Sequence, residues 1–141
     1  MSTIVVKIGG GRGIDPTQIG AEVASLVRAG SRIVVVHGGS NETTELAAAL
    51  GHPSRMITSP GGQVSRRTDA RTMEIFAMAC AGRVNTSVVA SLRAAGVNAI
   101  GMSGVDAGMW VGVRKDAIRS VEDGRVVVIR DDLSGRVERV N

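Results

Sequence analysis

The residue whose type and position most clearly suggest chemistry is Lys7, in the apolar run Thr3–Ile8 directly before a glycine loop. Lysine is rare here, because 15 of the 17 basic residues are arginines. An ammonium at the end of a buried strand is costly unless it meets an anion, and its compact charge suits phosphate oxygens. We therefore predict that Lys7 binds an anion. The alternative is a lysine that only extends from a strand end into solvent.

Two glycine loops, Gly9–Gly11 and Gly38–Gly39, each follow an apolar run and precede a predicted helix. Glycine permits close approach of the backbone, and amides at a helix N-terminus bind anions. Neither loop has the GxxxxGK[ST] pattern of phosphate-loop NTPases, and Ile14 stands where the dinucleotide fingerprint needs a third glycine. A plain nucleotide-binding domain is therefore disfavoured. Two such loops with one lysine between them indicate an anion site more strongly than either loop alone.

A second group of candidates follows a segment rich in proline and glycine. Arg66, Arg67 and Arg71 cluster there, and a guanidinium in this place could bind a carboxylate through two hydrogen bonds. The alternative is a set of exposed arginines at a helix start. Asp69 is predicted to cap that helix, and His37 either contacts a ligand or closes its strand.

The order of these elements predicts an α/β fold, a three-layer sandwich with a mainly parallel central sheet and C-terminal antiparallel hairpins. Turns at Asp123-Gly124 and Ser134-Gly135 would form the hairpins, and the last helix would bend near Gly82. Residues 52–68 are read as a long loop or irregular hairpin. The predicted strands are residues 3–8, 33–36, 97–102, 109–114, 117–122, 125–130 and 135–140, and the helices are residues 16–29, 41–50 and 69–95.

The composition fits one domain of 141 residues with a substantial apolar core. No long apolar run and no export signal are seen, so we expect a cytoplasmic protein with no membrane span. The single Cys80 excludes an internal disulfide, and His52 lacks a partner of metal-ligand type, so no metal site is predicted. A net charge of +4 indicates either a solvated basic surface or an acidic partner. One Phe and one Trp are too few for base stacking, which disfavours nucleic acid.

Three segments, Ile4–Gly10, Val34–Gly39 and Ser65–Asp69, resemble the amino acid kinase family. Within this family the chain is similar to the acetylglutamate kinase branch. The segments Gly51–Asp69, Asn98–Gly104 and Gly135–Asn141 resemble kinases that act on aminoadipate or glutamate attached to LysW, a small acidic carrier protein.

This resemblance implies that ATP, with Mg²⁺, phosphorylates a carboxylate to give an acyl phosphate in lysine or arginine biosynthesis. Such transfer relies on positioning and on charge stabilisation. Lys7 would be catalytic and would neutralise the transferring phosphoryl group. The implied phosphate-binding residues are Gly9, Gly10, Gly38 and Gly39, and the implied substrate-binding residues are Arg66, His37 and Ser40.

Members of the family are about twice as long as a single domain of this size. The resemblance therefore implies that residues 1–141 are the amino-acid-binding N-terminal lobe, and that the ATP-binding C-terminal lobe is absent. It also implies an acidic carrier partner and a homodimer built by residues 72–95. Two alternatives stay open, a lobe that acts on free N-acetyl-L-glutamate and a non-catalytic amino-acid-binding module. The carrier would dock on Arg55, Arg66, Arg67 and Arg71.

Overall fold

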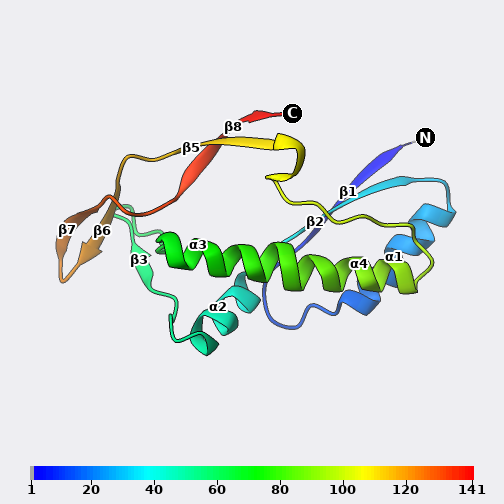
Figure 1. Ribbon diagram of the computed structural model, residues 1–141, viewed down its shortest axis with the longest axis horizontal. Helices are drawn as coiled ribbons and strands as arrows, with labels where there is room; N and C mark the ends of the chain where they lie inside the picture. Colours follow the sequence, from blue (N-terminus) through cyan, green and yellow to red (C-terminus); the bar gives the residue numbers. More distant parts are fainter. Residues whose placement is uncertain (1) are drawn as a thin grey trace. The chain divides into compact units, whose positions relative to one another are not determined.

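A computed structural model describes residues 2–141, apart from the side chains of Pro16 and Thr17. The chain divides into two compact units, which are described separately. Unit 1 comprises residues 1–43 and 76–102, and unit 2 comprises residues 44–75 and 103–141. The fold class is mixed α/β, with a parallel sheet and antiparallel hairpins, and this confirms the prediction from the sequence (Figure 1).

Unit 1 contains a parallel two-stranded sheet of β1 (Thr3–Ile8) and β2 (Arg32–His37). Both strands are rich in β-branched residues, which fit a pleated surface. Helix α1 (Pro16–Arg28) connects them and begins at the proline that the sequence predicts. The helix α2 (Ser40–Ala49) follows β2, so each strand is followed by a glycine loop and a helix.

The core of unit 1 lies between this sheet and two helices. Ile8, Val23, Val88 and Leu92 are buried together there. Helix α1 packs against α4 (Asn85–Ala94), and the two backbones come close at Gly20. A Cβ atom on that glycine would lie 2.5 Å from the Ser91 hydroxyl oxygen, so only glycine fits at this crossing.

One continuous helix runs over residues 70–94 and is drawn in green in Figure 1. It consists of α3 (Ala70–Ala77), the π-helical segment η1 (Met78–Val84) and α4. The π segment occupies the place where the sequence predicts a bend near Gly82. By length and composition alone this helix could cross a membrane, although the sequence contains no long unbroken apolar run. Core helices of soluble proteins meet the same criterion, and Val88 and Leu92 are buried in the core of unit 1.

The predicted strand at residues 97–102 is wrong in one respect. Exposure alternates along the segment, and Val97 and Ala99 pack against the core as a strand would place them. However, no strand ladder forms there within residues 2–141. The segment lies against helix α4 instead, because the Asn85 side chain fills the space beside Gly101.

Unit 2 is built from antiparallel pairs. β3 (Met56–Thr58) pairs with β4 (Val64–Arg66), so the irregular hairpin predicted in residues 52–68 is confirmed. β6 (Ile118–Glu122) pairs with β7 (Arg125–Ile129) through a turn at Asp123 and Gly124, both with positive φ. β5 (Trp110–Arg114) pairs with β8 (Gly135–Val140). A hairpin at Ser134-Gly135 was predicted and is wrong, because β8 pairs with β5 rather than with β7.

The connection between β7 and β8 is held by Asp132, whose side chain is 2% exposed. Its two carboxylate oxygens accept hydrogen bonds from the Thr68 and Ser134 amides, each at 2.8 Å. The Leu133 amide in turn donates to the Thr68 carbonyl at 2.7 Å. These bonds tie the connection to the segment before α3, which explains why residues 130–134 do not form a hairpin turn.

Asp69 caps helix α3, as the sequence predicts. Its Oδ1 atom accepts a hydrogen bond from the Thr72 amide at 2.8 Å and lies 3.3 Å from the Nε2 atom of His52. The bond from the Thr72 amide is the main cause that lowers the pKa of the Asp69 carboxyl, with smaller contributions from the Thr72 hydroxyl and from His52.

We expect Asp69→Ala to lower the free energy of unfolding by about 1 kcal/mol at neutral pH, because the first turn of α3 loses its cap. The folded-state pKa of Asp69 is depressed, so this stabilisation is present above the usual value of 3.8 and is lost as pH falls through the lowered value. Urea denaturation of both proteins across this acid range would check it. If the difference in free energy of unfolding between the two proteins stays constant into strong acid, the stabilising role of the charged Asp69 cap is contradicted.

Candidate functional site

The two glycine loops predicted to form an anion site lie in direct backbone contact. A Cβ atom on Gly10 would lie 2.5 Å from the Gly39 nitrogen and 2.7 Å from the Ser40 nitrogen. A Cβ atom on Gly38 would lie 2.7 Å from the Gly10 nitrogen. Such distances exclude any side chain at these positions without movement of the backbone. The structure therefore brings the loops together at the carboxyl edge of the parallel sheet, where ligands bind in α/β folds.

Two backbone hydrogen bonds hold the loops in register. The Gly38 amide donates to the Ile8 carbonyl at 3.0 Å, and the Asn41 amide donates to the Gly10 carbonyl at 2.8 Å. The Gly38 amide therefore already has an acceptor in the protein, and its predicted role as an anion donor stays a prediction. Within residues 2–141, the Gly10 and Gly39 amides donate to no acceptor. They are the loop amides that an anion could use near the N-terminus of α2.

Thr43 and Cys80 support the second loop and were not identified from the sequence. Thr43 is fully buried, and its hydroxyl donates to the Gly39 carbonyl at 2.6 Å. Its Oγ1 atom also lies 3.9 Å from the Sγ atom of Cys80, in the π segment. A Cβ atom on Gly39 would lie 2.6 Å from that sulfur. The only signal for Thr43 in the sequence is its position four residues after Gly39, where a threonine hydroxyl can bond back to the helix start.

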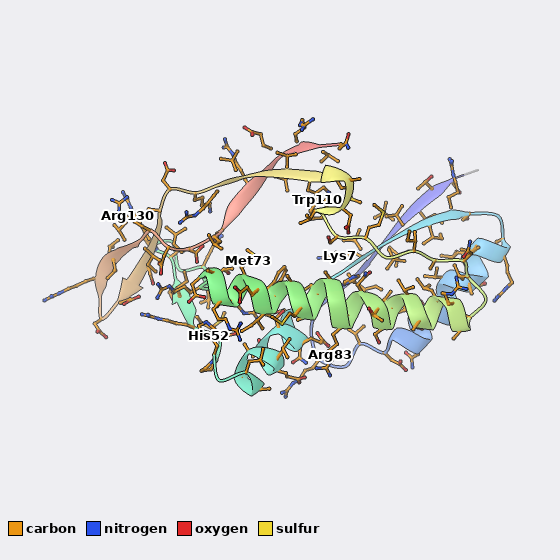
Figure 2. All side chains as sticks on the ribbon, in the orientation of Figure 1. Lys7, His52, Met73, Arg83, Trp110 and Arg130 are labelled. Atoms are coloured by element: carbon orange, nitrogen blue, oxygen red, sulfur yellow. The ribbon has the colours of Figure 1, made fainter. Side chains whose placement is uncertain are left out.

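Lys7, which is labelled in Figure 2, is exposed, as are the other residues that share its face of β1. Its neighbour across the sheet is Val36, and Val5 and Val34 form the next pair on the same face. All three valines are exposed, Val5 by 66%. The expectation that Lys7 is buried is therefore wrong, whereas its binding of an anion stays a prediction. Its place beside the glycine loop, at the carboxyl end of β1, agrees with the prediction.

A hollow of about 320 Å³ lies between β1, the first glycine loop and α1. Lys7 and Glu22 are the two charged residues in its lining, and Gly9 and Ile14 lie at its loop end. The rest of the lining is apolar.

The other predicted residues of unit 1 lie at the second loop. His37 ends β2 and is half-buried, and its Nδ1 atom lies 3.1 Å from the Gly38 carbonyl oxygen. Ser40 is exposed and is the first residue of α2. Both residues border the glycine contact, so the structure brings Lys7, His37 and Ser40 to the same edge of one sheet.

Arg66 belongs to unit 2, where it ends β4 and its guanidinium donates to the Thr44 hydroxyl at 2.8 Å. The adjacent Arg67 has a different partner, because its guanidinium contacts both carboxylate oxygens of Asp131 at 2.8 and 2.6 Å. This contact raises the pKa of Arg67 and lowers the pKa of Asp131. The two arginines therefore have separate roles.

The arginines predicted to rim a docking surface are mostly neutralised by carboxylates nearby. Arg55 pairs with Glu122 and Arg71 with Glu74, both at 2.9 Å, in addition to the pair of Arg67. These pairs weaken the case for an acidic partner at this place. In the part of the chain that the structure describes, no group of three or more His, Cys, Asp or Glu residues is placed to hold a metal ion.

A family model described as the amino acid kinase family matches residues 2–139. A protein from Thermus thermophilus named LysW-aminoadipate kinase is 51% identical over 98% of this chain and 51% of its own length. A protein of the same name from Deinococcus radiodurans is 48% identical over 96% of this chain and 46% of its own length. The chain thus spans about half the length of the curated relatives it matches.

A crystal structure of N-acetylglutamate synthase from Neisseria gonorrhoeae, complexed with coenzyme A and L-arginine, is similar with a TM-score of 0.56. The similarity covers 99% of this chain and 31% of that chain, at 22% sequence identity. At this identity the likeness concerns the fold alone.

We expect Gly10→Ala to destabilise the protein by about 1–3 kcal/mol, the usual cost of forcing extra atoms into a packed site. The added methyl group would collide with the backbone at Gly39 and Ser40. The matched control is Gly11→Ala, one residue later, because no atom lies within 4 Å of its added carbon. Thermal and urea unfolding would compare the variants. Equal effects would contradict the close contact of the loops.

Proposed function

The chain belongs to the amino acid kinase family, and on that basis we propose that it forms the substrate-binding lobe of a carboxylate kinase. The kinase transfers the terminal phosphoryl group of ATP to the side-chain carboxylate of 2-aminoadipate or glutamate carried on LysW. The product is an acyl phosphate, an intermediate for lysine or arginine biosynthesis. The names of the two bacterial relatives support aminoadipate, and a relative from Cenarchaeum symbiosum, 40% identical, is named for either amino acid.

The observation that carries this proposal is the contact of the two glycine loops beside Lys7. Phosphoryl transfer asks little covalent chemistry of the protein and depends on positioning and charge stabilisation. The Gly10 and Gly39 amides, which lack acceptors among the described residues, could bind oxygens of the migrating group. Lys7 supplies the positive charge at the end of β1. Gly9 and Gly38 would shape this cradle through their lack of side chains.

We propose that Arg66 binds the amino acid substrate. A guanidinium can bind a free α-carboxylate, and the Thr44 hydroxyl orients the Arg66 side chain from one side. Ser40 and His37 border the loop contact and are assigned to substrate binding. If the α-amino group is attached to a carrier, the α-carboxylate remains available as the group that Arg66 recognises.

ATP is assigned mainly to the half of the relatives that this chain does not span. Mg²⁺ is assigned together with ATP to that half, and the roles proposed for Lys7 and for the loop amides concern these residues alone. A homodimer through the long helix is also part of the proposal, and the exposed Phe76 and Met78 support it.

The function is tested in a protein that carries both lobes. It is incubated with ATP and LysW-bound 2-aminoadipate, and the acyl phosphate is trapped with hydroxylamine as a hydroxamate. Free N-acetyl-L-glutamate is tested in parallel. Hydroxamate from the free substrate alone would assign the chain to the acetylglutamate kinase branch, and binding without turnover of either substrate would make it a binding module.

In that protein we expect Lys7→Ala to lower kcat by roughly 10²–10³ and to change KM little. Charge on the migrating group is greatest in the transition state, so the Lys7 ammonium stabilises the transition state more than the bound substrate. The matched control is Arg32→Ala, which removes an exposed cation from the other end of the same sheet. Steady-state kinetics would compare kcat and KM of the two variants. An unchanged kcat for Lys7→Ala would show that this lysine only extends from the strand end into solvent.

We expect Arg66→Ala to weaken substrate binding by about 2–5 kcal/mol, the usual cost of removing one partner from a desolvated charge pair. Arg67→Ala should leave substrate binding nearly unchanged and lower stability instead, because Arg67 pairs with Asp131. Calorimetric titration with substrate and urea unfolding of each variant would separate the two effects. Equal losses of affinity would contradict the assignment of Arg66.

A further inference from the structure

Thr43, in helix α2, is a fully buried polar side chain to which the proposed function gives no role. Valine has the same branched shape and carries no hydroxyl that burial would desolvate. A threonine at such a position therefore needs a hydrogen-bond partner within the protein. That partner is the Gly39 carbonyl oxygen, to which the Thr43 hydroxyl donates at 2.6 Å.

The bond from the Thr43 hydroxyl is not needed to satisfy the Gly39 carbonyl. The Thr43 amide already donates to the same oxygen at 2.9 Å. A threonine hydroxyl that bonds back to the carbonyl four residues earlier slightly destabilises a helix rather than stabilising it. We therefore look for the contribution of this hydroxyl in the orientation of the carbonyl, not in the stability of α2.

The orientation of the Gly39 carbonyl determines the direction of an amide at the contact of the two loops. A peptide group is planar and trans, so its C=O and N–H groups point in opposite directions. Two hydrogen bonds to the Gly39 oxygen therefore also fix the N–H group of Ser40. The Ser40 nitrogen lies beside the first loop, because a Cβ atom on Gly10 would come within 2.7 Å of it.

The packing around Gly39 restricts its displacement but not the rotation of its peptide groups. On one side, a Cβ atom on Gly10 would lie 2.5 Å from the Gly39 nitrogen. On the other side, a Cβ atom on Gly39 would lie 2.6 Å from the Cys80 sulfur and 3.4 Å from a Val84 methyl group. Glycine still allows wide rotation about φ and ψ. The Thr43 hydroxyl, itself 3.9 Å from the Cys80 sulfur, restricts that rotation.

We propose that Thr43 is a positioning residue for phosphoryl transfer, an inference that rests on the proposed function. Its hydroxyl holds the Gly39–Ser40 peptide so that the second glycine loop presents its amides to the migrating group. Thr43 acts through this loop and does not touch the substrate, because its side chain is fully buried. Donors that are oriented before charge develops need no reorganisation during the reaction.

The test compares variants of Thr43 in a protein that carries both lobes. Thr43→Val removes the hydroxyl and keeps the branched shape. We expect it to lower kcat by roughly 10- to 100-fold, because a small misplacement of a catalytic group has an effect of this order. KM for ATP and for the amino acid substrate should change little. Thr43→Ser, which keeps the hydroxyl, should retain most of the parent kcat.

The matched control is Thr72→Val, which removes a second buried hydroxyl near the start of a helix. The Thr72 hydroxyl contacts His52 and not a glycine loop, so kcat should stay unchanged. Thr43→Ala is a second variant without the hydroxyl, and its kcat should fall like that of Thr43→Val. An unchanged kcat in either folded variant, or a Thr43→Ser variant as slow as Thr43→Val, would overturn the inference.

A spectroscopic measurement distinguishes the failure of this inference from the failure of the proposed function. In the same protein labelled with ¹⁵N-serine, the Ser40 amide signal is identified by its loss in Ser40→Ala. This signal should shift in Thr43→Val and stay near its place in Thr43→Ser and Thr72→Val. An active protein in which Thr43→Val alters neither the signal nor kcat would overturn only the positioning role. A shifted signal in a protein that phosphorylates no substrate would overturn the proposed function.

Discussion

The contact between Gly10 and the Gly38–Ser40 loop is the constraint on which the candidate site depends. The register of the parallel sheet sets Ile8 beside His37, so both strands end at the same level and both loops leave from one edge. The loops then meet so closely that no Cβ atom fits between them. Thr43 supports the second loop from helix α2, and Cys80 supports it from the long helix. The π-helical turn, a rare conformation found frequently at functional sites, is therefore part of the support of this loop.

The second constraint is electrostatic and lies within unit 2. Buried Asp132 accepts two backbone hydrogen bonds, and removing its carboxylate would leave those amides without acceptors, at a cost of about 1–3 kcal/mol each. The exposed Asp131 and the half-buried Glu122 each neutralise an arginine near the β3–β4 hairpin.

Much of the fold was predictable because local patterns and tertiary packing agree. Apolar runs before glycine loops identified β1 and β2, and the cap at Asp69 marked the start of α3. The strand at residues 97–102 was mispredicted because alternating apolar residues indicate only which side chains face the core. Whether the segment joins a sheet depends also on an adjacent strand with an unpaired edge. The pairing of β5 with β8 joins residues far apart in sequence, so no local turn signal could indicate it.

In the candidate site, too, local features were predictable from the sequence and long-range contacts were not. The two glycine loops predicted an anion site, but only the structure shows that they are in backbone contact and that the Gly38 amide donates to the Ile8 carbonyl. The composition gave an excess of arginine, but the partner of each arginine depends on contacts such as that between Arg67 and Asp131, 64 residues apart. The burial of Lys7 was also misjudged, because an apolar strand with one covered face looks the same in sequence as a strand covered on both faces.

The exposure of Lys7 changes how its charge would act. A buried ammonium would carry a desolvation cost in every state, whereas an exposed one is stabilised by water until a ligand arrives. Two charges about 4 Å apart attract by ~1 kcal/mol in water but by ~4 kcal/mol at an effective dielectric constant of 20. The valines that surround Lys7 on the sheet face are apolar and exposed, so any molecule that covers them also removes water from the ammonium. Lys7 would therefore contribute most when the site is covered, which favours the state in which the migrating group is enclosed.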